Sequence, residues 1–348
     1  MADPASSHGL QYLVSFVEVL ERIVDRRDLD RQASADLMAY LMSGEASEAQ
    51  IGGVLAALRT KGVTPVELAG FAETMRRHAV RVEHGFHDLV DTCGTGGGAP
   101  SFNISTAAAI VAAAAGARVA KHGNRAVTSQ CGSFDVLEKL GVNPTSDPAS
   151  SIASLEKHRI AFLFAQAHHP AMRHVGPARK SLGLRTVFNQ LGPLANPAGA
   201  RRQVIGVYDF KLARGMAEAL QMLGAERALL VHGADGLDEI SPCAATFACR
   251  LDGGQLDELQ LEPADFGLEP LPASALKPGE TLDENSAILE EAISDASSLR
   301  SRAILPSVSA ALVIAGIANS WRDGADRARA VIESGAARRL LEDLRSST

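Results

Sequence analysis

The chain has 348 residues, of which 46% are apolar and 22% charged, and its formal net charge at pH 7 is −7. This length is enough for two domains with a sizeable core. The acidic balance argues against a general nucleic-acid-binding or membrane-surface protein, although it leaves room for a local basic pocket. The four cysteines have neither metal-site nor disulfide-framework spacing. The longest apolar run, 107–117, is too short to span a bilayer, and the chain opens on no signal peptide, so we expect a cytoplasmic protein.

The first 80 residues predict a small helical module after a disordered tail at 1–8. Apolar residues recur at steps of three and four, which is the period of an amphipathic helix. Further helices are expected around 37–41 and 51–58, and Thr64 followed by Pro65 predicts a capped helix start. The first predicted apolar face consists of Leu13, Phe16, Val17, Leu20 and Val24. An apolar face on this module would suit an oligomer contact as well as an internal one.

From Asp88 onward, short apolar segments alternate with helical stretches, which is typical of a parallel sheet with crossover helices. The predicted strands are 89–90, 117–120, 160–164, 204–207 and 227–231. A hairpin with a Gly-Gly turn is expected at 251–261 and a long surface connection at 269–286. Helices are expected from Asn285 to the end, including 307–318 and 325–334.

The segment DTCGTGGGAPSFNIST, residues 91–106, precedes an alanine-rich apolar stretch at 107–115. This order predicts a strand, a loop of bare backbone and a helix N-terminus, where N–H groups can approach a phosphate because few Cβ atoms intervene. A glycine-rich turn without a ligand is the alternative. Four polar side chains favour the phosphate interpretation, because capping would need only one or two of them: Ser101, Asn103, Ser105 and Thr106.

A second polar segment, KHGNRAVTSQCGS at 121–133, follows the strand predicted at 117–120. It therefore lies at a carboxyl end of the sheet, where ligands bind in open α/β folds. Lys121 and Arg125 offer positive charge, and Asn124 offers donors and an acceptor. A solvated basic loop is the alternative.

A third segment, 167–185, is cationic in an otherwise acidic protein. A helix starting at Pro170 would place Arg173 and Lys180 on one side and Arg179 elsewhere. Most single cations here are expected to be surface residues, and the adjacent His168 and His169 point in different directions, so no histidine metal site is expected. The following NQLGPLANP, 189–197, has many helix breakers and predicts an irregular loop.

The fourth segment, GADGLDEISP at 233–242, follows a predicted strand and carries adjacent carboxylates at Asp238 and Glu239. Magnesium binds through few carboxylates together with substrate phosphates. An acidic turn without a metal is the alternative. Beside a phosphate loop, however, this segment favours a magnesium-dependent enzyme acting on a phosphorylated substrate.

The motifs GTGG–FNIST, KHGNR, HPAM–R, FN–LGPL–NP and GLDEISP occur in this order, and with them the chain resembles the anthranilate phosphoribosyltransferase family over essentially its whole length. The resemblance implies a nucleoside phosphorylase/phosphoribosyltransferase-like α/β fold: a small N-terminal helical domain, 9–80, joined by a helical segment near 170–192, and a larger domain, 86–345, with a mostly parallel central sheet flanked by helices. It also implies a homodimer formed through the helical domain, with the active site at the hinge.

The implied reaction transfers the phosphoribosyl group of 5-phosphoribosyl 1-pyrophosphate to the amine of anthranilate, in tryptophan biosynthesis, with Mg²⁺, two ions per site. The residues implied to bind phosphoribosyl pyrophosphate are Gly94, Gly97, Gly98, Ser101, Asn103, Ile104, Ser105, Thr106, Lys121, His122, Gly123, Asn124, Arg125, Ser129 and Ser133. Those implied for anthranilate are Gly94, His122, Asn124, His169 and Arg179, and those for the metal are Ser105, Asp238 and Glu239. No single nucleophile or base is implied, so catalysis would rest on electrostatics and alignment.

The chain departs from the family pattern at several positions. Its glycine loop is one residue shorter, with Gly98 where the family has aspartate, and Pro306-Ser307 stands where the family has Asn-Ala. Two alternatives share the architecture. A pyrimidine nucleoside phosphorylase would have a lysine-histidine-serine loop in place of GTGG and no KHGNR. A non-catalytic nucleic-acid-binding relative would be basic and would lack Arg179 and Asn124.

Overall fold

A computed structural model describes residues 16–125, 131–144 and 147–347. The tail predicted at 1–8 and Leu13 lie outside these residues. The N-terminal part consists of helical residues 16–24 and of α2 (Arg31–Ser43), α3 (Glu48–Lys61) and α4 (Pro65–Arg77). The Thr64 hydroxyl accepts the Glu67 N–H, and Pro65 occupies the first turn, which confirms the predicted helix start.

The apolar face predicted for the first helix is partly wrong. Phe16 is buried, but Val17 and Val24 are 54% and 64% exposed, and Ile23 is buried instead. The helix thus packs on its neighbours along a narrower stripe than the sequence pattern indicates. An apolar strip of the helical domain remains open to solvent.

The larger domain is built on a seven-stranded sheet with the order β3-β2-β1-β4-β5-β6-β7. The strands from β3 to β5 in this order pair in parallel, whereas β6 is antiparallel to both β5 and β7, which confirms the predicted mostly parallel sheet. The strands are β1 (Leu89–Gly94), β2 (Arg118–Gly123), β3 (Ile160–Phe164), β4 (Arg202–Gly206), β5 (Arg227–Gly233), β6 (Thr246–Asp252) and β7 (Gln255–Leu261). Gly253 and Gly254 form the predicted hairpin turn, with φ of 56° and 85°.

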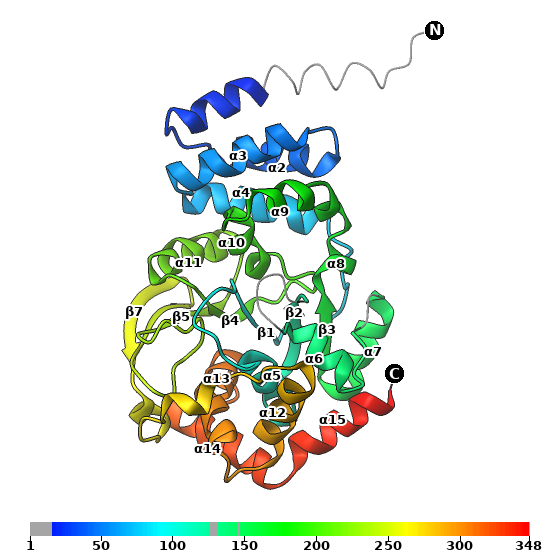
Figure 1. Ribbon diagram of the computed structural model, residues 1–348, viewed down its shortest axis with the longest axis vertical. Helices are drawn as coiled ribbons and strands as arrows, with labels where there is room; N and C mark the ends of the chain where they lie inside the picture. The colour runs from blue at the N-terminus through cyan, green and yellow to red at the C-terminus, as the bar shows by residue number, and fades with distance from the viewer. Residues whose placement is uncertain (1–15, 126–130, 145–146, 348) are drawn as a thin grey trace.

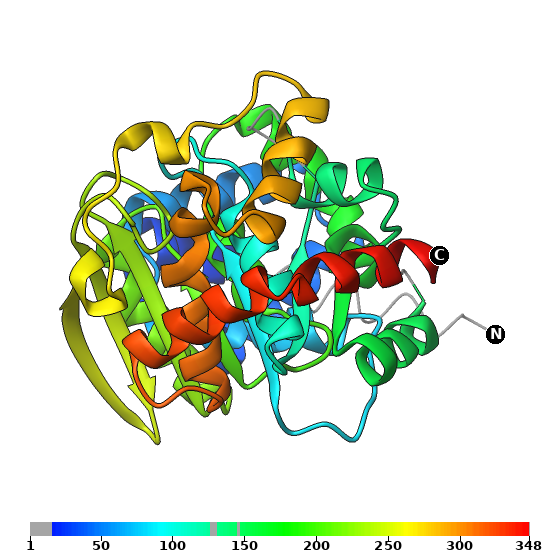
Figure 2. The same cartoon turned by 90° about the horizontal axis from the view of Figure 1, so that it is seen from below.

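The two faces of the sheet are covered by different helices (Figures 1 and 2). Val204 and Leu229 pack with one set, whereas Ile205 and Leu230 pack with the other, because successive side chains of a strand alternate. The first set comprises α5 (Ile104–Ala114), α6 (Ser133–Lys139), α12 (Leu282–Ser294), α13 (Leu299–Ala315), α14 (Trp321–Glu333) and α15 (Ala336–Ser346). The second comprises α10 (Val187–Leu194), α11 (Ala213–Met222) and the helical domain; α7 (Pro148–His158) packs beside β3.

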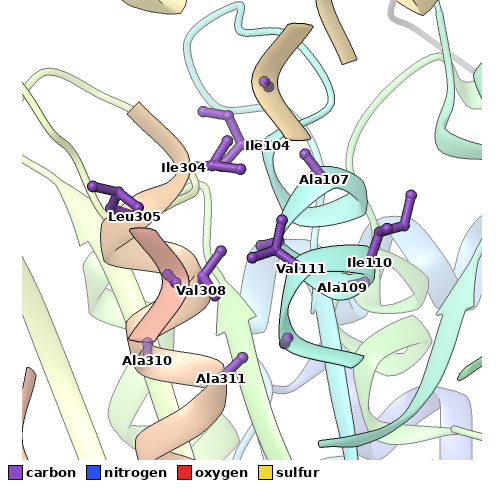
Figure 3. Packing of buried hydrophobic residues seen from close by; sticks show 14 of the residues in the cluster. Ile104, Ala107, Ala109, Ile110, Val111, Ile304, Leu305, Val308, Ala310 and Ala311 are labelled. Carbon is purple, nitrogen blue, oxygen red and sulfur yellow. The ribbon is translucent and has the colours of Figure 1, made fainter. Parts of the chain in front are cut away.

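Helix α5 packs against α13 through small side chains (Figure 3). Ala107 and Val111 of α5 and Val308 and Ala311 of α13 are completely buried. Their small size lets the two helices approach each other closely. This packing fixes the N-terminus of α5 next to the carboxyl end of β1.

The prediction of a loop at 189–197 is wrong, because α10 runs from Val187 to Leu194 with Pro193 inside its last turn. The Asn189 side chain accepts the Thr186 N–H at 3.0 Å and so caps the start of this helix. Its apolar side chains then pack on the helical domain. Burial of this face outweighs the backbone hydrogen bond that Pro193 cannot donate.

The single helix expected from Pro170 is also wrong. The segment forms the 3-10 helix η1 (Pro170–His174) and the separate helix α9 (Gly176–Leu182). Pro177 lacks the N–H that a continuous helix would need, and it restricts the backbone of the residue before it. Helix α9 contacts α3, and η1 contacts α2, so this segment packs on the helical domain (Figure 1).

The predicted surface connection at 269–286 contains the 3-10 helix η4 (Ala273–Leu276), and α12 starts at Leu282, before the expected Asn285. Helix α13 starts at Leu299 and continues through Pro306, whereas the sequence indicated a start at Ser307. The remaining short elements are α8 (Ala165–His168), η2 (Phe210–Leu212) and η3 (Pro263–Phe266).

No single helix among the described residues has both the length and the apolar composition of a membrane span. Helices α12 and α13 meet that test only as a pair bent by 71°.

Candidate functional site

The strand order changes direction at β1, which lies between β2 and β4. In open α/β folds, the crevice at such a point, outside the carboxyl ends of the strands, is where ligands bind. The glycine loop follows β1, the KHGNR segment starts within β2, and the GLDEISP segment follows β5. The fold therefore brings three of the sequence motifs to one edge of the sheet.

The glycine loop and the acidic loop after β5 lie against each other. A Cβ at Gly98 would collide with the backbone and carboxylate of Asp238, and a Cβ at Gly206 would collide with the Asp238 carbonyl. The Ala99 N–H donates to the Gly236 carbonyl at 2.8 Å. Glycines are thus required where the two loops meet. Gly94 lies beside the same carboxylate, since a Cβ there would be 3.6 Å from Asp238 Oδ2.

Helix α5 presents uncommitted polar groups at its start. The Asn103 side chain makes no capping hydrogen bond. The Thr106 hydroxyl is buried without a hydrogen-bond partner among the described residues. Ser101 and Ser105 are half-buried nearby in the chain. Ile104, in contrast, is a core side chain (Figure 3), so only its backbone faces this region.

Lys121 is buried at the centre of the site. Its ammonium group donates to the Thr92 carbonyl and to the Ser105 hydroxyl, the latter at 3.2 Å. Burial lowers the pKa of Lys121, whereas the carboxylates of Asp91 and Glu239 act in the opposite direction. A buried cation held next to the hydroxyl of a helix N-terminus is a suitable anchor for an anion.

Of the two predicted metal carboxylates, Glu239 lies beside Ser105, whereas Asp238 lies against Gly98. Burial, and then the neighbouring Asp238, raises the pKa of Glu239 to about 7. Burial also raises the pKa of Asp238. Glu239 Oε2 accepts the Ser307 hydroxyl at 3.3 Å, and Ser105 is also hydrogen-bonded to Glu239.

No group of three or more His, Cys, Asp or Glu side chains in the described part of the chain could hold a metal by itself. The oxygen atoms of Ser105, Asp238 and Glu239 nevertheless fit Mg²⁺, which takes few protein carboxylates and completes its shell with phosphate and water.

His122 points to the opposite face of β2 from Lys121, because successive strand residues alternate. Its ring centroid lies 5.2 Å from that of His169. Burial lowers the pKa of His122 to about 3 and that of His169 to about 4, so both rings are neutral at pH 7. The His122 ring is hydrogen-bonded to the backbone of Gly192 and the His169 ring to that of Ala195, and each of these bonds acts against the lowering of the pKa by burial. Together the two rings form an uncharged wall.

Arg179 lies on α9 and is half-buried. Its guanidinium lies over the Phe188 ring, 4.9 Å from the centroid. Burial lowers the pKa of Arg179, and no carboxylate among the described residues pairs with it. A guanidinium without a partner carboxylate can bind the carboxylate of a ligand through two parallel hydrogen bonds.

The other predicted site residues that the structure describes lie at or just after the end of β2 and contact one another and α6. Arg125 pairs with Glu138 at 2.6 Å, and the Asn124 side chain accepts the Arg125 N–H. The Ser133 hydroxyl donates to the Asn124 carbonyl at 3.2 Å, and Gly123 packs under Ser133. Ser129 lies outside the described residues.

The sequence interpretation missed several residues that organise the site. Asp91 is completely buried and accepts the His122 N–H at 3.1 Å and the Asn196 side-chain amide at 2.8 Å. The Asn196 amide also donates to the Ala120 carbonyl. This network joins β1 and β2 to the loop after α10. The Asn-Pro pair at the end of a breaker-rich segment was the only sequence signal for it.

Comparisons with known proteins identify the family of this chain. The glycosyl transferase family α/β domain matches residues 86–338, and the helical bundle domain of the same family matches 17–79. The anthranilate phosphoribosyltransferase of Myxococcus xanthus is 46% identical over 94% of this chain and 97% of its own length. That of Roseiflexus sp. is 49% identical over 93% and 95%.

Solved structures agree with these sequence matches. The anthranilate phosphoribosyltransferase of Thermus thermophilus superposes with a TM-score of 0.88 at 40% identity, covering 94% of this chain and 98% of that one. The Saccharomyces cerevisiae enzyme, in complex with PRPP (phosphoribosyl pyrophosphate) and Mg, superposes with a TM-score of 0.85 at 29% identity, covering 96% and 99%. The sequence, the fold and the arrangement of the motifs all lead to one conclusion: the chain belongs to the anthranilate phosphoribosyltransferase family.

Proposed function

We propose that this chain transfers the phosphoribosyl group of phosphoribosyl pyrophosphate to the amine of anthranilate, giving N-(5-phosphoribosyl)anthranilate and pyrophosphate in tryptophan biosynthesis. The observation that carries the proposal is the two-sided arrangement at β2. Lys121 lies beside the start of α5, where phosphate is predicted to bind. His122 lies beside the neutral ring of His169 on the opposite face of the strand. Such a site suits a polyanionic donor and an aromatic acceptor.

The donor binds along the glycine loop and the start of α5. The N–H groups of this backbone, the free Asn103 and Thr106 side chains and the Lys121 ammonium offer donors to pyrophosphate and to the ribose 5-phosphate. Gly123 to Arg125 and Ser133 extend the site at the end of β2.

Ser105, Asp238 and Glu239 would hold magnesium, with two ions per site. The metal would supply positive charge to stabilise the leaving pyrophosphate. The raised pKa of Glu239 supports this role, since a carboxylate that is costly to ionise alone is stabilised by a bound cation.

Anthranilate binds on the other side, with its carboxylate on Arg179 and its ring near His122, His169 and Asn124. The aromatic amine is neutral at pH 7, so no general base is needed to make it nucleophilic. The protein orients the amine toward ribose C1 and stabilises the departing charge, which accounts for the reaction without a nucleophilic side chain.

The chain divides into a helical domain, 9–80, and an α/β domain, 86–345, and it forms a homodimer through the helical domain. The exposed Val17 and Val24 support this contact, because they form an apolar strip on the outer helix. The enzyme acts in the cytoplasm on small molecules, with no nucleic-acid or membrane partner.

The proposal is tested by mixing the full chain with Mg²⁺, phosphoribosyl pyrophosphate and anthranilate and by following anthranilate fluorescence. We expect the fluorescence to fall, and to stay constant when the donor is omitted or the metal is chelated. Constant fluorescence with both substrates in excess would reject the proposed reaction.

A further inference from the structure

Arg185 lies in the segment between α9 and α10 and reaches across to the glycine loop. Its Nη2 donates to the Gly97 carbonyl at 2.5 Å. Gly97 has φ of 89°, and a Cβ there would collide with the Arg185 guanidinium. The loop therefore has glycine at the point where the arginine covers it.

A second contact fixes the orientation of this arginine. The Arg185 guanidinium lies over the Tyr208 ring, 4.3 Å from its centroid. The Tyr208 N–H donates to the Thr95 hydroxyl at 3.0 Å, and the Thr95 N–H donates to the Gly206 carbonyl at 2.8 Å. The ring that supports Arg185 and the base of the glycine loop are thus attached to the same strand end.

The contact at Gly97 determines where the next N–H points. In a trans peptide the carbonyl of one residue and the N–H of the following residue point in opposite directions. The Gly97 carbonyl is held by Arg185, and the Gly98 N–H on the other side of that peptide donates to Asp238. This peptide is therefore held between a cation and one of the proposed metal carboxylates.

Arg185 also belongs to the segment that carries Arg179. Helix α9 ends at Leu182, Gly183 follows with φ of 62°, and Arg185 comes just before α10. One short stretch of chain thus contacts the donor loop and presents the acceptor arginine.

We propose that Arg185 is a positioning residue that orients the Gly97–Gly98 peptide and couples the donor loop to the segment bearing Arg179. The identities of donor and acceptor rest on the proposed function. Because coupling between two sites is reciprocal, ordering the loop by the donor favours the position of Arg179 that binds the acceptor, and the reverse holds as well.

The test compares wild type with Arg185→Ala, Arg185→Lys, Tyr208→Leu and the control Lys180→Ala, which removes an exposed charge from α9 in the same segment. Amide hydrogen exchange of residues 94–103 is measured on the unliganded proteins. We expect faster exchange in Arg185→Ala and a smaller increase in Arg185→Lys and Tyr208→Leu. Lys180→Ala should match wild type.

Kinetics then test the coupling. Loss of a hydrogen bond from a charged donor should raise the KM for phosphoribosyl pyrophosphate by about tenfold in Arg185→Ala. The KM for anthranilate should rise with it, whereas kcat changes less. Arg179→Ala, in contrast, should affect the KM for anthranilate alone.

If the amides of residues 94–103 exchanged in Arg185→Ala at the same rate as in wild type, the proposal would be overturned. If the KM for phosphoribosyl pyrophosphate rose without a change in exchange, Arg185 would be a direct ligand instead of a positioning residue. If wild type bound neither substrate, the proposed function would fail, and the exchange measurement would still decide the role of Arg185.

Discussion

Lys121 and His122 are adjacent, yet each serves a different side of the site. The strand places the ammonium of Lys121 beside the start of α5 and the His122 ring beside His169. Asp91 supports the same strand by accepting the His122 N–H. One register of β2 thus fixes the separation between the donor side and the acceptor side, and a slip by one residue would exchange them.

Arg179→Ala should raise the KM for anthranilate by about 10- to 100-fold and leave that for phosphoribosyl pyrophosphate nearly unchanged. The reason is the loss of a charge-assisted pair with the substrate carboxylate. Steady-state kinetics with each substrate varied in turn measure the effect, and Lys180→Ala is the matched control. Equal increases in both KM values would refute the acceptor role.

Glu239→Ala should raise the magnesium concentration needed for half-maximal turnover by at least about tenfold, since even outer-shell changes at metal sites have effects of this size. Turnover is titrated with Mg²⁺ at saturating substrates. Glu258→Ala, which removes an exposed glutamate on β7, is the control. An unchanged magnesium titration would remove Glu239 from the metal site.

The buried histidines predict how stability depends on pH. The pKa of His169 is lowered from its ordinary value of 6.5 to about 4, so between these values the unfolded chain binds a proton that the folded chain does not. The free energy of unfolding should therefore fall as the pH drops from about 6.5 to about 4, by up to about 1.4 kcal/mol per pH unit for this group.

Urea unfolding at several pH values measures this dependence. His169→Asn should reduce the slope, whereas His87→Asn, at an exposed histidine, should not. An identical slope in wild type and His169→Asn would show that His169 does not titrate in this way.

At the scale of elements, the core around α5 should tolerate little added volume. Ala109→Leu inserts a large side chain at a fully buried position and should reduce the free energy of unfolding by about 1–3 kcal/mol. Ala114→Leu, at the half-buried end of α5, is the control and should change it much less. Chemical denaturation measures both, and equal values for the two variants would contradict this view of the packing.

Most elements of the sheet were predictable because short apolar strands, glycine turns and capped helix starts are local signals. Helix α10 was not, because its breakers are visible in the sequence, whereas the buried face that outweighs them is formed only in the tertiary fold. The site, like the fold, was predictable only where the signal is local. Lys121, Asp238 and Glu239 stand in recognisable motifs, but the network of Asp91 with Asn196 connects residues far apart in sequence and has no local pattern. Arg185 was one cation among several until the fold placed it over Gly97.

At the scale of the whole molecule, the exposed strip on the first helix leads to a prediction about assembly. Val24→Asp places a charge on the proposed dimer contact and should shift the protein toward the monomer. Sedimentation velocity or light scattering measures the mass, and Leu299→Asp, at an exposed apolar residue of the other domain, is the control. A wild-type monomer, or a variant that stays dimeric, would argue against this interface.

The close contact between Gly98 and Asp238 also limits which amino acids position 98 can accept. A single substitution to the aspartate that the family resemblance implies here would drive its Cβ into the residue that is proposed to bind the metal. An inserted residue that lengthens the loop would avoid that collision. The amino acid allowed at position 98 therefore depends on loop length, which is a case of epistasis between a deletion and a substitution. Among relatives, we expect the shorter loop and the missing carboxylate to be inherited together.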